Sequence, residues 1–209
     1  MPVNFNLPTT AEYLRTLPEI ILVLFGTLLM ILEGLAGERS CKGTGPIALV
    51  AILAAFAAAF MAEKGPAFQN FLIVDDFATY FRLLVLVVGA FTVLCSISYL
   101  EREKIDSGEY YALLLFSLVG QCLLATSNEL IMVFIGLEIS SIATYILAGF
   151  QRDDRRNNEA AIKYFLLGSF ATAFLLYGVA WIYGLTGTTN LAQIGKLLAD
   201  PRAVQAPWM

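Results

Sequence analysis

Glu138 is the residue in this sequence whose surroundings most demand a chemical explanation. It lies in the stretch 129–150, ELIMVFIGLEISSIATYILAGF, where its nearest neighbours are mostly apolar. As a helix, this stretch spans a bilayer, and Glu138 then lies roughly 13 Å from one end and 18 Å from the other. An acid at that depth costs on the order of 2.5–3.5 kcal/mol, faces protein or water, and marks a proton or ion path. The alternative is a buried acid that only fixes helix packing by hydrogen bonds.

Other polar side chains surround Glu138 at helical spacing. Ser141 and Tyr145 follow it at i+3 and i+7 and therefore share its face. In the preceding apolar stretch, Ser117 and Gln121 form a second polar pair at i and i+4. Because that stretch ends where the next begins, we expect Gln121 near the depth of Glu138. A hydrogen-bonded chain through water is one way to connect them.

Three further charged residues lie inside apolar stretches. Glu33 and Arg82 are near the ends of theirs, and we interpret both as interfacial anchors whose side chains reach the headgroups. Lys163 is near the start of the sixth stretch, where anchoring and function are equally good interpretations. It lies roughly 13 Å along the axis from the level of Glu138. We therefore expect Glu138 to have another, closer cationic partner.

Composition indicates a membrane protein without a cofactor site of its own. The chain is 58% apolar, has a mean hydropathy of +0.73, and has 14% charged residues, against about 25% in soluble domains. A net charge of −4 gives no indication of nucleic-acid binding. With no histidine and three widely separated cysteines, we expect no haem, iron–sulfur, zinc or disulfide site. No glycine-rich phosphate loop occurs in the sequence.

The predicted fold class is all-α, a polytopic transmembrane helix bundle. Alternation typical of barrel strands is missing from its apolar runs, and each run is near the ~20 residues that a spanning helix needs. Gly136, Ser140 and Thr144 form a small-residue stripe that favours close helix packing. In the tail 188–209, LAQIGKLLAD indicates either a short interfacial helix or an extracytoplasmic loop. The six predicted spans are 17–35, 46–62, 77–100, 110–127, 129–150 and 160–187.

Loop charges predict the orientation. The segment before the first span and the second and fourth loops contain only two basic residues, Arg15 and Lys64. These segments, including the N-terminus, are therefore predicted to be outside. The first, third and fifth loops carry the larger basic set and are predicted to be cytoplasmic. That set is Arg39, Lys42, Arg102, Lys104, Arg152, Arg155 and Arg156.

Two long motifs resemble a known family. NELIMVFIGLEISSIATYILAGF and NNEAAIKYFLLGSFATAFLLYGVAWIYGLTGTTNL are similar to the antiporter-like membrane subunits of respiratory complex I, most of all to the subunit N family of NADH-quinone oxidoreductase. The segments PEIILVLFG and DDFATYFRLL also fit that family. The resemblance covers nearly the whole chain. Sodium–proton antiporter and hydrogenase membrane subunits share the glutamate but less of the surrounding sequence.

The resemblance implies proton translocation. Glu138 matches the family's glutamate, which works beside a lysine of a following helix, and Lys163 matches an additional lysine; both are implied to act in proton transfer, with Ser141, Tyr145, Gln121 and Ser117 as supporting polar residues. Such subunits usually contain two inverted repeats behind three leading helices. We therefore expect an incomplete antiporter-like fold and an N-terminal fragment: leading helices in 1–106, the start of the first repeat in 107–187, and the tail 188–209.

The resemblance also implies what lies outside the chain. NADH, FMN, iron–sulfur clusters and quinone belong to partner subunits, and the partners are other complex I membrane subunits in the lipid bilayer. The expected location is a bacterial inner (cytoplasmic) membrane, with the chain crossing it several times. Two alternatives remain open, namely a subunit of a cation–proton antiporter and a truncated, non-pumping membrane scaffold.

Overall fold

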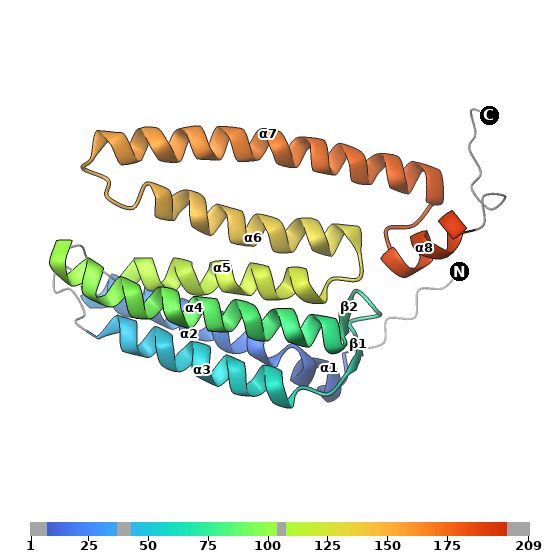
Figure 1. The fold of residues 1–209 in the computed structure, drawn as a ribbon, viewed down its shortest axis with the longest axis horizontal. Coiled ribbons are helices and arrows are strands. Elements are labelled where there is room, and N and C mark those ends of the chain that lie inside the picture. Colours follow the sequence, from blue (N-terminus) through green and yellow to red (C-terminus); the bar gives the residue numbers. More distant parts are fainter. Residues whose placement is uncertain (1–7, 37–42, 104–107, 200–209) are drawn as a thin grey trace.

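Six long helices run side by side along the length of the molecule (Figure 1). The computed structural model describes residues 8–36, 43–103 and 108–199. All six long helices are long and apolar enough to cross a membrane. The predicted all-α class and six spans are therefore confirmed. The long helices are α2 (Leu17–Ala36), α3 (Thr44–Met61), α4 (Asp76–Glu103), α5 (Gly108–Thr126), α6 (Leu130–Ala148) and α7 (Arg155–Thr186).

The largest difference from the predicted bounds is at the start of α7. The helix begins at Arg155, five residues before the predicted start, because Asp154 caps it. The Asp154 side chain accepts a hydrogen bond from the backbone N–H of Arg156 at 2.8 Å, as N-cap residues commonly do. Three basic residues on which the orientation prediction also depends, Arg39, Lys42 and Lys104, lie outside the described residues.

Helices α2 to α5 pack around one buried core. Alanines recur on the inner face of α3, and their small side chains let α2, α4 and α5 approach closely. Gly89 has the same effect on α4, because a Cβ there would lie 2.5 Å from Leu118 Cδ1 of α5. The core includes Leu22, Leu29, Ala48, Ala51, Ala55, Leu86, Val93, Leu115 and Cys122.

Helix α6 packs against α5 through two glycines. A Cβ at Gly120 would lie 2.5 Å from the Gly136 carbonyl oxygen, and one at Gly136 would lie 3.0 Å from the Gly120 carbonyl oxygen. Ser140 is equally close, with its backbone nitrogen 2.5 Å from the same Gly120 position. The small-residue stripe predicted on this helix therefore serves at Gly136 and Ser140 to bring two backbones together.

Helix α7 is covered far less than the others. Only 6% of its most apolar 18-residue window is buried, against 56% for α5. It lies along α6 on the side away from the α2–α5 bundle, so these helices form successive layers (Figure 1). Close contact with α6 occurs near the α6–α7 loop, where a Cβ at Gly149 would lie 2.8 Å from Ala161 Cβ.

Four short elements gather at one end of the molecule, which we call the hairpin end (Figure 1). We did not predict the first three from the sequence, and the two strands among them have three residues each, too few to show a period of two. The fourth confirms the helical alternative for part of the tail, while residues 200–209 lie outside the described chain. The four short elements, in chain order, are α1 (Thr10–Arg15), β1 (Gly65–Ala67), β2 (Leu72–Val74), which is antiparallel to β1, and α8 (Leu191–Ala199).

The turn between α5 and α6 ties this end together. Asn128 donates from its backbone N–H to the Phe71 carbonyl at 2.9 Å and from Nδ2 to the Asn70 carbonyl at 3.0 Å. Its own carbonyl accepts from the N–H of Leu191 at 2.9 Å. This turn has three residues, 127–129, and it links the β-hairpin to the start of α8.

Candidate functional site

Glu138 lies at the middle of α6, on the face turned toward α7. It shares that face with Tyr145, since seven residues make nearly two helical turns. The Tyr145 ring packs edge-on against Tyr164 of α7, with centroids 4.7 Å apart, and against Phe165 at 5.8 Å. A Cβ at Gly168 would lie 1.9 Å from the Tyr145 hydroxyl oxygen. The spacing thus places Glu138 between the two most weakly covered helices.

One carboxyl oxygen of Glu138 is buried without a hydrogen bond. The side chain as a whole is partly buried, yet Oε1 has no partner within residues 8–36, 43–103 and 108–199. An unmade hydrogen bond of this kind typically costs about 1–3 kcal/mol. Unsatisfied buried groups are rare enough in folded proteins to need an explanation. This oxygen is therefore an open hydrogen-bond acceptor at the middle of α6.

The other polar side chains of α6 lie close to this face. Ser141 shares it by spacing, and its carbonyl accepts the Thr144 hydroxyl at 2.8 Å. The Thr144 hydroxyl also lies 3.5 Å from the hydroxyl of Tyr164. Together with Tyr145, these groups line the layer between α6 and α7 with hydroxyls on the α6–α7 loop side of Glu138.

Ser117 and Gln121 meet α6 on its opposite face. The Ser117 and Ser140 hydroxyl oxygens are 3.0 Å apart, and Gln121 Nε2 donates to Ser117 Oγ at 3.2 Å. Gln121 Nε2 is also 3.5 Å from Ser140 Oγ. The structure therefore brings the polar pair of α5 to Ser140 and not to Glu138. Sequence spacing identified the pair but not this partner, because it could not tell which face of α6 turns to α5.

Lys163 forms an ion pair within its own helix. Its Nζ donates to Glu159 Oε1 at 2.5 Å, and both side chains are mostly exposed. Lysine side chains on a helix reach toward its N-terminus, which here is the α6–α7 loop. In the described structure Lys163 thus points away from the level of Glu138, and the two make no ion pair.

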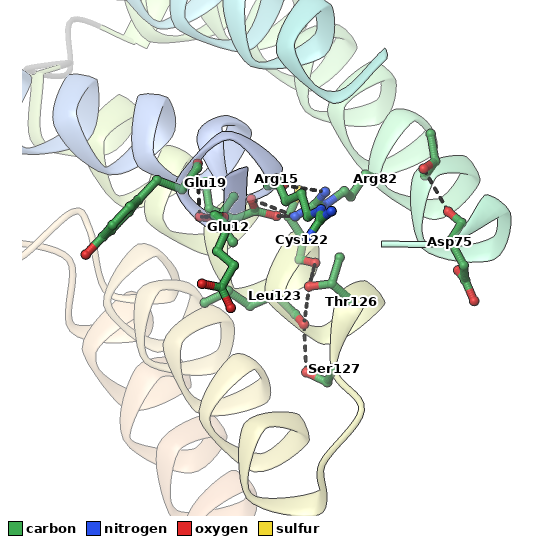
Figure 2. A network of polar contacts seen from close by, with 12 residues as sticks. Glu12, Arg15, Glu19, Asp75, Arg82, Cys122, Leu123, Thr126 and Ser127 are labelled. Carbon is green, nitrogen blue, oxygen red and sulfur yellow. Dashed lines mark hydrogen bonds and ion pairs between the residues drawn. The ribbon is translucent and has the colours of Figure 1, made fainter. Parts of the chain in front are cut away.

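A buried charge pair, Glu19 with Arg82, was not predicted from the sequence. Arg82 Nη2 lies 2.7 Å from Glu19 Oε1 and 2.8 Å from Oε2, and Nη1 donates to the Arg15 carbonyl at 3.1 Å. Figure 2 shows these three residues together between α2 and α4. Arg82 is 0% exposed, so our prediction that it is an interfacial anchor is wrong.

The physical reason is that α2 and α4 begin at the same end of the molecule. Glu19 is two residues into α2 and Arg82 six residues into α4, so opposite charges meet at similar depth. The similar depth of the two charges could have been predicted from the sequence, because both helices were predicted to start outside. Glu33, the other predicted anchor, is partly buried three residues before the end of α2.

Metal-ligating side chains do not cluster in the part of the chain that the structure describes. No three His, Cys, Asp or Glu residues come together there. Cys95 is exposed on α4, and Cys122 is buried in the α2–α5 core; neither lies beside Glu138. Cys41 lies outside the described residues. Intramembrane carboxyl, hydroxyl and amide groups are thus the chemistry of this candidate site, which suits proton exchange better than group transfer.

Comparison with known proteins finds the chain similar to antiporter-like membrane subunits. Residues 127–208 match the family model described as "NADH:quinone oxidoreductase/Mrp antiporter, TM". NADH-quinone oxidoreductase subunit N 1 of Solibacter usitatus is 59% identical over 93% of this chain and 40% of its own length. Subunit N of Trichlorobacter lovleyi is 40% identical over 88% of this chain and 38% of its own length.

Solved structures agree with this relationship. A chain of respiratory complex I from Thermus thermophilus is 32% identical, with a TM-score of 0.66 over 83% of this chain and 38% of that one. A chain of an archaeal membrane-bound sulfane sulfur reductase is 25% identical, with a TM-score of 0.71 over 93% and 42%. The predicted resemblance is confirmed, and the chain spans about 40% of the length of these relatives. With its six spans, it is a multi-pass protein of a bacterial inner membrane.

Proposed function

We propose, from its kinship with the antiporter-like subunits of NADH-quinone oxidoreductase, that this chain is part of a proton-translocating membrane subunit of such a complex. The observation that carries the proposal is the buried, unbonded Oε1 of Glu138 at mid-span. A carboxyl group at that depth is costly and is retained where it moves or holds charge. The proposed partners of the chain are other membrane subunits of the complex. NADH, FMN, iron–sulfur clusters and quinone are proposed to bind to partner subunits.

Glu138 is proposed to work by changing its partner. When Glu138 is charged, it attracts a cationic side chain on another helix and favours the protonated form of that side chain. When Glu138 is neutral, this attraction is lost. A lysine is the natural partner, because burial shifts the lysine's pKa readily. Lys163, paired with Glu159 at the α6–α7 loop end of α7, is proposed to serve in proton entry or exit there rather than as this direct partner.

Nearby hydroxyls are proposed to support the transfer. Ser141 and Tyr145 offer hydrogen bonds to water on the face of Glu138. Ser117 and Gln121 stiffen the α5–α6 contact through Ser140, which fixes the helix that carries the carboxyl group. This assigns the two polar groups different roles, proton conduction on one face of α6 and positioning on the other.

The test is Glu138→Gln in the intact complex, which keeps the shape of the side chain and removes its charge. Proton pumping into membrane vesicles, driven by NADH, is expected to fall roughly tenfold, or ~1.4 kcal/mol of lost driving interaction. The matched control is Glu109→Gln, which removes an acid from the exposed Glu109–Arg152 pair and is expected to leave pumping intact. Unchanged pumping in the Glu138 variant would refute the proposal. Lower assembly with normal pumping per assembled complex would support the scaffold alternative.

A cation–proton antiporter subunit is the second candidate, because the matching family model covers both NADH:quinone oxidoreductases and Mrp antiporters. It gives Glu138 the same chemistry but couples it to cation transport. Purification of the chain from its native membrane separates the two. Recovery with quinone-reducing activity supports the first, and recovery with sodium-dependent proton exchange supports the second.

A further inference from the structure

The Tyr145 ring packs into α7 on the loop side of Glu138. Its centroid lies 4.7 Å from that of Tyr164 and 5.8 Å from that of Phe165, both edge-on. A third α7 residue, Gly168, lies at the far end of the ring, because a Cβ there would be 1.9 Å from the Tyr145 hydroxyl oxygen and 2.5 Å from Cζ. These three residues share one face of α7 by their spacing. We call the surface that they present to Tyr145 the ring contact.

Gly168 is the member of the ring contact that cannot carry a side chain. The three atoms nearest its Cβ position all belong to Tyr145 and lie 1.9–3.0 Å away, so an alanine would push the ring out. At Gly178 and Gly184, further along α7, an added Cβ would meet nothing within 4 Å in the described chain. Glycine is disfavoured inside a helix relative to alanine. At Gly168 that disadvantage is offset by a specific ring packed against the helix backbone.

The Tyr145 ring extends toward the level of Glu138. At the loop end, Gly149 of α6 lies beside Ala161 of α7. Gly168 is seven residues from Ala161, roughly 10 Å along the axis, whereas Tyr145 is four residues from Gly149, roughly 6 Å. The hydroxyl therefore lies deeper than its own Cα, as expected for a helical side chain that leans toward the N-terminus. An interfacial tyrosine would instead direct its hydroxyl to the headgroups.

We propose that the Tyr145 ring is a water barrier between Glu138 and the α6–α7 loop, and that Gly168 positions it. This role rests on the proposed proton transfer by Glu138. A carboxyl group that exchanges protons at mid-span must be shielded from bulk water on at least one side, since open water on both sides would let protons leak across the membrane. A ring held between α6 and α7 on the loop side supplies that shield.

Thiol accessibility in the intact complex tests the barrier. Ser141→Cys places a thiol between Glu138 and Tyr145 on the same face of α6, in a chain that keeps Cys122 as its only native cysteine. A membrane-impermeant, cationic methanethiosulfonate reagent is added to vesicles in which the α6–α7 loop faces the medium. Cys122 is buried in the α2–α5 core, so its labelling reports general loosening of the fold.

Removing the ring is expected to open this side of the layer. With Tyr145→Ala, the labelling rate at Ser141→Cys is expected to rise roughly tenfold, about the effect of losing two edge-to-face ring contacts. The matched control is Tyr177→Ala, whose ring is 63% exposed and packs edge-on against Trp181 of the same helix. This control is expected to leave the rate unchanged, and Cys122 is expected to stay unlabelled in both variants.

Gly168→Ala tests the ring contact without removing the ring. Its methyl group displaces the hydroxyl end of Tyr145, so the labelling rate is expected to rise, while Gly178→Ala leaves it unchanged. Three results would overturn the proposal: the parent rate in both the Tyr145→Ala and Gly168→Ala chains, an equal rise in the control variants, or a parallel rise at Cys122. Labelling requires no proton transfer, so failure of the barrier is distinguishable from failure of the proposed function, which unchanged pumping in Glu138→Gln would show.

Discussion

The α2–α5 bundle and the α6–α7 layer differ in how their charged side chains within the spans are paired. In the bundle, Arg82 and Glu19 neutralise each other in full burial. In the layer, Glu138 keeps a buried oxygen without a hydrogen bond in the described chain, and Lys163 pairs with Glu159 at the surface. A fixed buried pair holds one arrangement, because separating it is costly. The proposed proton transfer by Glu138 requires instead that this side chain be free to change partners.

The two regions are nevertheless joined at both ends. At the hairpin end, Asn128 bonds the β-hairpin and α8. At the other end, Arg152 pairs with Glu109 across an exposed gap of 3.2 Å, and the Phe150 ring packs edge-on against Tyr110 with centroids 5.7 Å apart. Helix α7 is nevertheless the least covered of the six spans, with 6% of its most apolar window buried.

The largest expected effect comes from breaking the buried pair. Arg82→Met leaves Glu19 as an uncompensated buried charge, which costs about 3–5 kcal/mol. We expect strongly reduced assembly of the subunit, measured as its amount in the purified complex. Lys163→Met is the matched control, since it removes a cation from an exposed pair worth about 0–1 kcal/mol. Equal assembly of the two variants would show that burial does not separate these regions.

A double substitution sharpens the same comparison. Glu19→Leu combined with Arg82→Met replaces both charges by apolar side chains of similar size, which is often neutral for stability. Assembly is expected to recover relative to Arg82→Met alone. If the double variant assembles as poorly as the single one, Arg82 contributes mainly through its hydrogen bond to the Arg15 carbonyl.

The next effect concerns the contact between the regions. Gly120→Ala places a methyl group 2.5 Å from the Gly136 carbonyl oxygen, and overpacking of this kind typically costs about 1–3 kcal/mol. Gly178→Ala is the matched control on α7, because nothing lies within 4 Å of its added Cβ. It is expected to be neutral or slightly stabilising, as alanine favours helix over glycine. The thermal denaturation midpoints of the two variants give the comparison, and a similar decrease in both would contradict it.

The spans could be predicted from the sequence, but the pairing of side chains between them could not. Hydropathy predicted all six spans, since a bilayer imposes length and composition on each helix separately. The depth of Glu138 followed in the same way. Arg82 was misread because its partner lies 63 residues away, and depth alone did not show that α2 and α4 turn those two faces together. Pairing between helices depends on rotation about each axis, which weak amphipathicity in these spans leaves undetermined.

The smallest expected effect is a pH response of Glu12 in the short helix α1. Hydrogen bonds from Thr9 lower the pKa of Glu12 below its ordinary value of 4.5, so its ionised form stabilises the fold above pH 4.5. That contribution is lost as the pH falls below 4.5 through the folded-state pKa. The protection factor of the Phe68 N–H, which donates to Glu12, is expected to decrease over this range and to be low at all pH values in Glu12→Gln. The Gly187 N–H donates to the Tyr183 carbonyl at the end of α7 and is the internal control, because no carboxylate accepts its hydrogen bond. A parallel decrease at Gly187 would mean that acid loosens both regions together and that Glu12 does not act locally on the bundle.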